Sequence, residues 1–168
     1  MTTDVTKIDI HEMREYIESR CGEGSKIYLG VDSERYKHKG VWYADYLLAA
    51  VIHVDGSKGC KIFAEVQKEL DYDQRKDRPF NRMMTEVRKV CELYERLKDL
   101  LLEYEFEIHV DISPDETCGS NVAYSAAVGY IKSMTLTDAV TKPSAWCASF
   151  AADRARELGV ARGYVETA

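Results

Sequence analysis

The chain has 168 residues, 45% of them hydrophobic and 31% charged, and its formal net charge is −6 at pH 7. This length and composition are typical of a globular protein with a sizeable core, and we expect a single domain over residues 1–168. No apolar run approaches the roughly 20 residues of a membrane span, and the first residues lack the basic start and apolar run of a secretory signal. We therefore expect a cytoplasmic protein with no membrane partner.

The N-terminal half predicts one helix followed by three strands. The helix covers residues 9–20, where Asp9 and Glu12 form a capping-box-like start and the CGEG stretch at 21–24 ends it. A strand follows at 26–32, then a polar, basic turn at 35–40. Residues 42–54 and 60–70 are two further strands, separated by the turn sequence DGSKG. Short connections predict that the three strands form an antiparallel meander.

The C-terminal half alternates helices and strands. Apolar residues at three- and four-residue steps predict a long amphipathic helix from Pro79 to Glu105. A strand at 106–113, a helix at 120–131, a short strand at 132–137 and a helix at 141–158 follow, and the tail after about residue 158 is expected to be loosely ordered. This order predicts a mixed α/β protein with a five-stranded sheet flanked by helices and an extra helix at the N-terminus.

The cysteines and histidines do not suggest a zinc site. The five cysteines are widely separated, and the four histidines show no ligand spacing. The negative net charge argues against a protein that coats nucleic acid, which would be basic. It does not exclude an enzyme that acts on nucleic acid, because catalytic carboxylates contribute negative charge themselves.

Two aspartates follow strand-like runs. Asp32 ends YLGVD and Asp111 ends IHVD, so each apolar strand runs into a carboxylate. If the two strands are neighbours, Asp32 and Asp111 lie side by side, where they repel each other unless a divalent cation binds between them. A turn or capping role is the alternative for either residue taken alone.

Two helix acids extend this set. Glu86 lies beside the core-facing stripe of the long helix, and Asp153 shares a helix face with Trp146 and Phe150. Acids at inward-facing positions are rare. A solvated acid or an ion-pair partner is the alternative for each. As an ordered set that falls on strand, helix, strand and helix, the four acids favour one metal site.

The element order and these acids resemble the ribonuclease H-like superfamily, and more closely its YkuK-type branch, whose function is unsettled. The likeness rests on IYLGVDSE, RMMTEV, IHVDISP and KPSAWCASFAADR, and it runs from the first helix to about residue 157. It implies that Asp32, Glu86, Asp111 and Asp153 are catalytic residues that bind two Mg²⁺ or Mn²⁺ ions. Ala155 stands where the branch often has histidine, and Glu86 falls two residues later than in ribonuclease H itself.

The activity implied by this resemblance is hydrolysis of phosphodiester bonds in RNA, DNA or a hybrid by a two-metal mechanism. Oxygen ligands without thiolate or imidazole match magnesium or manganese rather than zinc. Glu34 follows Asp32 by two residues on the same strand face, and it is either a water-mediated metal contact or a solvated acid.

Basic residues near these acids are the expected phosphate contacts, with plain solvation as the alternative: Arg35, Lys37, Lys39, Arg78 and Arg82. Tyr36, Trp42 and Tyr43 are candidates for stacking on bases, although strand aromatics more often belong to a core. The main alternative function is a catalytically weak or inactive module that binds nucleic acid or protein. A nucleotide phosphohydrolase ranks third, because the chain has no GxxxxGK[ST] phosphate loop.

Overall fold

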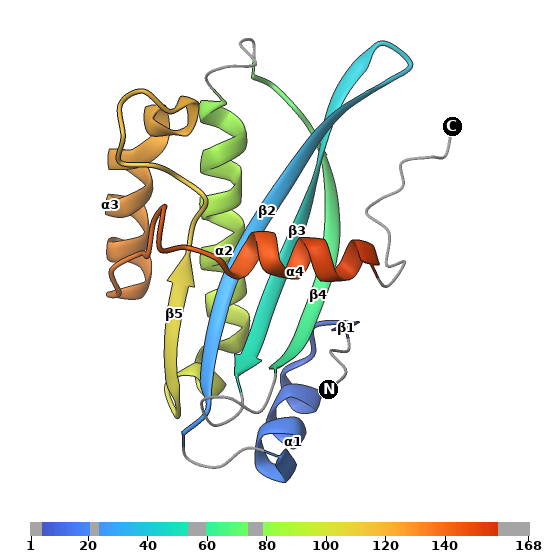
Figure 1. The fold of residues 1–168 in the computed structure, drawn as a ribbon, viewed down its shortest axis with the longest axis vertical. Helices are drawn as coiled ribbons and strands as arrows, with labels where there is room; N and C mark the ends of the chain where they lie inside the picture. The colour runs from blue at the N-terminus through green and yellow to red at the C-terminus, as the bar shows by residue number, and fades with distance from the viewer. Residues whose placement is uncertain (1–4, 21–23, 54–59, 74–78, 158–168) are drawn as a thin grey trace.

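A mixed sheet with strand order β1-β4-β3-β2-β5 organises the fold (Figure 1). The computed structural model describes residues 5–20, 24–53, 60–73 and 79–157. The elements are β1 Val5–Thr6, α1 Ile10–Arg20, β2 Lys26–His38, β3 Val41–His53, β4 Cys60–Leu70, α2 Phe80–Leu101, β5 Glu105–His109, the 3₁₀ turn η1 Gly119–Ala123, α3 Tyr124–Thr135 and α4 Cys147–Glu157. Among these residues, no helix is long and apolar enough to cross a bilayer.

The central strands form the predicted meander. β2 pairs antiparallel with β3, and β3 pairs antiparallel with β4. β5 then runs parallel to β2, as expected for a strand that returns after a helical crossover. The predicted mixed α/β class and the N-terminal helix are therefore confirmed.

The prediction of five strands is confirmed for four of them. The strand predicted at 132–137 is wrong, because α3 continues through this segment to Thr135 and ends where Leu136 adopts a left-handed φ of 58°. This continuation buries Thr135, whose hydroxyl donates a hydrogen bond to the Ile131 carbonyl oxygen, and it overrides the β-propensity of the sequence. The remaining strand of the observed sheet is the two-residue β1, which was not predicted.

Several predicted boundaries also move. The segment predicted as a basic turn belongs mostly to β2, which continues to His38 and turns on Lys39 and Gly40 with φ of 49° and 81°. Two successive left-handed residues suit a tight two-residue hairpin. The final helix begins at Cys147 rather than near Pro143, α2 ends at Leu101, and β5 ends at His109. The tail after residue 158 lies outside the described residues.

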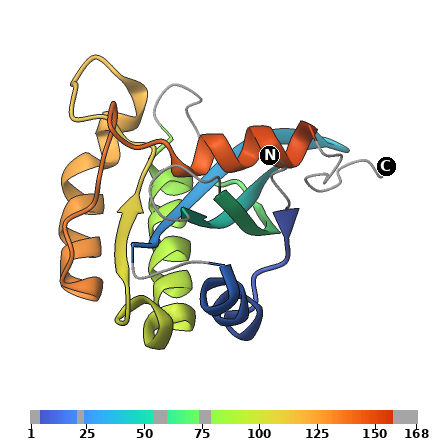
Figure 2. The same ribbon diagram turned by 60° about the horizontal axis from the view of Figure 1, so that its bottom comes forward.

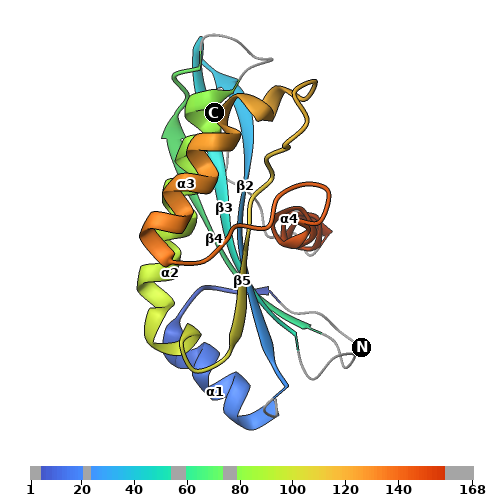
Figure 3. The ribbon, with the colours of Figure 1, turned by 90° about the vertical axis from the view of Figure 1, so that its left-hand side faces the viewer.

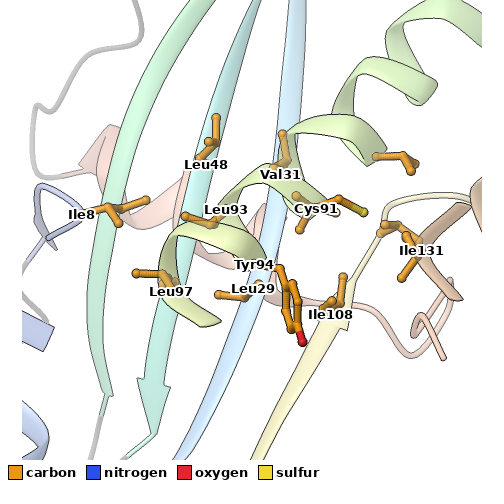
Figure 4. Packing of buried hydrophobic residues seen from close by; sticks show 14 of the residues in the cluster. Ile8, Leu29, Val31, Leu48, Cys91, Leu93, Tyr94, Leu97, Ile108 and Ile131 are labelled. Atoms are coloured by element: carbon orange, nitrogen blue, oxygen red, sulfur yellow. The ribbon is translucent and has the colours of Figure 1, made fainter. Parts of the chain in front are cut away.

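Helices cover both faces of the sheet. α1, α2 and α3 lie on one side, and α4 crosses the other (Figures 2 and 3). Alternation along β2 divides its side chains accordingly, with Leu29 and Val31 in the core beneath α2 and Tyr28 against the cluster beneath α4. In Figure 4, α2 contributes Leu93 and Leu97 to the first of these cores. The sheet is thus the middle layer of three.

The close approach of α4 to β2 depends on Gly30. A Cβ atom at Gly30 would lie 2.9 Å from the backbone nitrogen and 3.1 Å from the Cβ of Ala148. Because the nearest atom is a backbone nitrogen, the clash could be relieved only by a movement of α4 and not by rotation of a side chain. Gly30 is therefore the residue that sets the distance between this helix and the sheet.

We expect Gly30→Ala to lower the free energy of unfolding by roughly 1 to 3 kcal/mol through overpacking. Gly129→Ala is the matched control, since no atom lies within 4 Å of a Cβ there and the residue is inside α3. It should raise stability by roughly 0.5 to 1 kcal/mol through helix propensity. Urea unfolding of the two variants measures both effects, and a loss in both would contradict the steric role of Gly30.

Candidate functional site

Strand β2 places Asp32 on the side of the sheet that α4 covers. Val31 belongs to the core against α2, and the Ser33 hydroxyl donates a hydrogen bond to Glu86 of α2. Because neighbouring strand residues point to opposite faces, Asp32 points away from α2, on the same side as Gly30. Its side chain is half-buried.

Asp111 lies beside Asp32 in the sheet. β2 and β5 pair in parallel as far as Gly30 opposite His109, and continuing this register by two residues brings Asp32 opposite Asp111. The neighbouring residues Val110 and Ile112 belong to the core on the α2 side, so Asp111 also points toward the α4 side. The two strands are therefore neighbours, which is the condition under which the sequence places Asp32 and Asp111 side by side.

Glu86 reaches the same region from the opposite layer. It lies in the second turn of α2, and only 3% of its surface is exposed. Its Oε2 accepts the hydrogen bond from Ser33, whose Oγ also accepts one from Arg82 Nη1 at 2.8 Å. Glu86 Oε1 and Arg82 Nε are buried and find no hydrogen-bond partner among the described residues. Within the described part of the chain, Glu86 therefore keeps an unused acceptor.

The electrostatics of Glu86 connect it to both aspartates. Burial raises the pKa of Glu86 well above its ordinary value, and the negative charges of Asp32 and Asp111 raise the pKa further. The hydrogen bond from Ser33 and the charge of Arg82 oppose this rise. The carboxylates of Asp32 and Asp111 are thus close enough to Glu86 to disfavour its ionisation.

A network at the start of α2 fixes the position of Glu86. The Asp73 carboxylate accepts hydrogen bonds from the backbone nitrogens of Asn81 at 2.7 Å and Arg82 at 2.9 Å, and so caps the helix from eight residues upstream. Arg35 of β2 holds this capping segment by pairing with the Asp71 carboxylate and donating to the Asp73 carbonyl oxygen at 3.2 Å. The first turn of α2 is therefore tied to β2.

The predicted phosphate contacts lie apart from one another. Arg35 is engaged in the network above, and its guanidinium stacks 4.1 Å from the ring centroid of Trp42. Lys37 and Lys39 are exposed in the β2–β3 hairpin. Arg78 lies outside the described residues. Among the members of this set that the structure describes, only Arg82 donates a hydrogen bond to Ser33, the residue that binds Glu86.

The last helix presents Asp153 differently from the prediction. The buried, sheet-facing side of α4 consists of Cys147, Ala148, Ala151 and Ala152, whereas Asp153 is exposed. The helix approaches the sheet closely through small residues, and a carboxylate on that side would be desolvated. Glu34 is also exposed, on the same side of the sheet as Asp32.

Two buried polar residues near the site were missed by the sequence reasoning. Asp45 of β3 is 2% exposed and accepts a hydrogen bond from the Tyr36 hydroxyl at 3.2 Å. His109 is 1% exposed and precedes Asp111 by two residues. An acid inside the apolar run WYADYLLAA was a signal for Asp45, but nothing in the sequence indicates the partners of His109.

His109 joins β5 to the N-terminus of α4. Its Nδ1 accepts hydrogen bonds from the backbone nitrogens of Trp146 at 3.0 Å and Cys147 at 3.3 Å, and its Nε2 lies 2.9 Å from Glu107 Oε1. This pattern requires the neutral ring with the proton on Nε2. Burial lowers the pKa of His109 and so favours the same neutral form, whereas Glu107 raises the pKa and opposes this effect.

The site has the ligand chemistry for a hard cation but is not a finished metal site. Among the described residues, no three His, Cys, Asp or Glu side chains are arranged to hold a metal ion together. Carboxylate oxygens are nevertheless the donors that Mg²⁺ and Mn²⁺ favour, and Glu86 Oε1 is an unpartnered one. A cation near Glu86, Asp32 and Asp111 would relieve their mutual repulsion.

The site thus combines Asp32 of β2, Asp111 two residues beyond the parallel neighbour β5, and the buried Glu86 of the long helix α2. The chain matches the family model described as Ribonuclease H-like over residues 9–157, and it belongs to that family. No curated protein and no solved structure was found to match the chain.

Proposed function

We propose that the protein is a metal-dependent nuclease that hydrolyses phosphodiester bonds of RNA, DNA or an RNA–DNA hybrid. The observation that supports this most is Glu86, which is buried beside Asp32 and Asp111 in a ribonuclease H-like chain and has one oxygen without a partner among the described residues. Asp153 completes the proposed ligand set. Two Mg²⁺ or Mn²⁺ ions would supply an activated water and stabilise the leaving oxygen.

The chain's own residues prepare this site in specific ways. Ser33 donates to one Glu86 oxygen and accepts from Arg82, while the other Glu86 oxygen has no partner among the described residues. Lys142 Nζ lies 3.3 Å from Asp111 Oδ1, in a pair that is exposed enough to exchange for another cation at little cost. The proposal also includes membership of the YkuK-type branch and a cytoplasmic location. It further assigns phosphate contacts to the basic residues named in the sequence analysis.

Calorimetric titration with Mn²⁺ and Mg²⁺ tests the proposal directly. We expect the native protein to bind metal and to cleave one of a panel of labelled RNA, DNA and hybrid substrates. Asp32→Asn and Asp111→Asn should abolish both properties, because each removes a charged oxygen ligand. Asp99→Asn, at an exposed position of α2, is the control and should change neither. Binding and cleavage that survive both substitutions would overturn the assignment.

A non-catalytic ribonuclease H-like binding module is the second candidate. It is favoured by the lack, among the described residues, of three side chains arranged for a metal ion. If native protein and both variants bind metal equally weakly and cleave nothing, this second function becomes the better description. Capture of nucleic acid without cleavage would then be the expected result.

A further inference from the structure

One end of the sheet extends beyond α4. The cluster beneath α4 includes Leu47 and Val66 but no residue farther toward the β2–β3 turn. β2, β3 and β4 continue past this row, and the β2–β3 hairpin projects beyond the helix (Figure 1). On the α4 side, this end of the sheet is therefore left uncovered by the described helices.

Two tyrosines and a lysine form a platform on this uncovered face. Tyr36 and Tyr43 pair across the hairpin, with ring centroids 5.8 Å apart and an interplanar angle of 22°. Lys68 Nζ lies 4.9 Å from the Tyr43 centroid and 5.9 Å from that of Tyr36. The Tyr36 hydroxyl is anchored on the buried Asp45. We call Tyr36, Tyr43 and Lys68 the hairpin platform.

The platform shares a face with Asp32. Tyr36 follows Asp32 by four residues on β2, so both side chains point to the same side of the sheet. Four residues of strand span about 13 Å, a distance that a few nucleotides of an extended strand can cover. A chain held on the platform can therefore reach the carboxylates without crossing to the other face.

The charge and chemistry of the hairpin indicate the ligand. Lys68 supplies the positive charge of the platform, whereas Arg35 and Lys37 alternate with Tyr36 along β2 and point to the α2 side of the sheet. Half-buried aromatic rings beneath an ammonium group suit a ligand with flat rings and negative charges. Duplexes keep the faces of their bases stacked inside, whereas single strands expose them to aromatic side chains on a sheet surface.

We propose that the hairpin platform binds single-stranded nucleic acid by stacking unpaired bases on Tyr36 and Tyr43, with Lys68 contacting the backbone. The choice of nucleic acid as ligand rests on the proposed function. The platform lies outside the four acids and selects the form of substrate that reaches them.

Fluorescence anisotropy of a short labelled single-stranded oligonucleotide, measured in EDTA, tests this inference without cleavage. We expect Tyr43→Leu to raise Kd about tenfold or more, as for loss of one base–aromatic stack. Tyr36→Phe should keep the native Kd, because it retains the ring and removes only the hydroxyl. Tyr130→Leu, at an exposed tyrosine of α3, is the matched control. Circular dichroism establishes that each variant is folded.

The outcomes separate this inference from the nuclease proposal. Tighter binding of single strand than of duplex, weakened by Tyr43→Leu and by added salt, supports the platform even if Mn²⁺ produces no cleavage. Failure of the native protein to bind any single strand in EDTA overturns it. So does a native Kd in both Tyr43→Leu and Lys68→Met, whether or not the protein cleaves nucleic acid.

Discussion

In a metal-free buffer at neutral pH, Glu86→Gln should be more stable than the native protein by roughly 1 to 3 kcal/mol. The native carboxyl is buried beside Asp32 and Asp111, and one of its oxygens has no hydrogen-bond partner among the described residues, so its charged form is disfavoured. Glutamine keeps the shape and the hydrogen bond from Ser33 without the charge. Glu95→Gln, an exposed acid on the same helix, is the control and should have little effect.

The pH dependence has a defined sign. The folded-state pKa of Glu86 lies above its ordinary value of 4.5, so the folded protein holds this proton more tightly than the unfolded chain does. The free energy of unfolding therefore falls as pH rises from 4.5 toward the folded-state pKa. Urea unfolding over this window should show that fall in the native protein and its reduction in Glu86→Gln.

Manganese should reverse the order of stability. If Glu86 is a metal ligand, the native protein gains about 2.7 kcal/mol at a metal concentration one hundred times Kd, and Glu86→Gln gains much less. If the variant is instead less stable than the native protein at every pH in EDTA, Glu86 is a structural partner of Arg82. Comparing the stability of these two proteins with and without Mn²⁺ therefore distinguishes a metal-binding role of Glu86 from a structural pairing with Arg82.

The sequence predicted the parts of this site that depend on local periodicity. Alternation over residues 26–32 and 60–70 identified two strands, and the stripe on the long helix indicated that Glu86 lies near the core. These signals are reliable because each side chain's neighbours along the chain decide its face. The sequence placed Asp32 beside Asp111 only on the condition that their strands are neighbours, a condition that the parallel pairing of β2 with β5 meets.

Features that depend on contacts between distant segments were not predictable. Residues 35–38 appear as a polar turn in the sequence, yet pairing with β3 and the stack of Arg35 on Trp42 hold them in β2. Asp32 and Glu86 approach the same region from opposite sides of β2, which depends on which helix covers which face. Asp153 was predicted inward because the approach of α4 through alanines was not foreseen.

His109→Leu should lower the free energy of unfolding by roughly 3 to 5 kcal/mol. The backbone N–H groups of Trp146 and Cys147, at the start of α4, would lose their acceptor, and leucine has a different shape from the imidazole that it replaces. The native ring is 1% exposed and links β5 to Trp146 and Cys147. His53→Leu is the matched control, since His53 packs on the same Tyr28 and Trp146 rings. The centroid of its ring lies 6.0 Å from that of Tyr28 and 6.3 Å from that of Trp146.

The mechanism of this loss can be observed independently of its size. Nitrogen NMR of the native protein should show His109 as the neutral tautomer with the proton on Nε2, as two N–H donors at Nδ1 require. Hydrogen exchange should then accelerate in α4 of His109→Leu while α2 keeps its protection. Because α4 carries Asp153, Mn²⁺ affinity should fall in this variant as well. If hydrogen exchange accelerates equally in α2 and α4, or if His53→Leu is equally destabilising, His109 contributes only by filling space in the core.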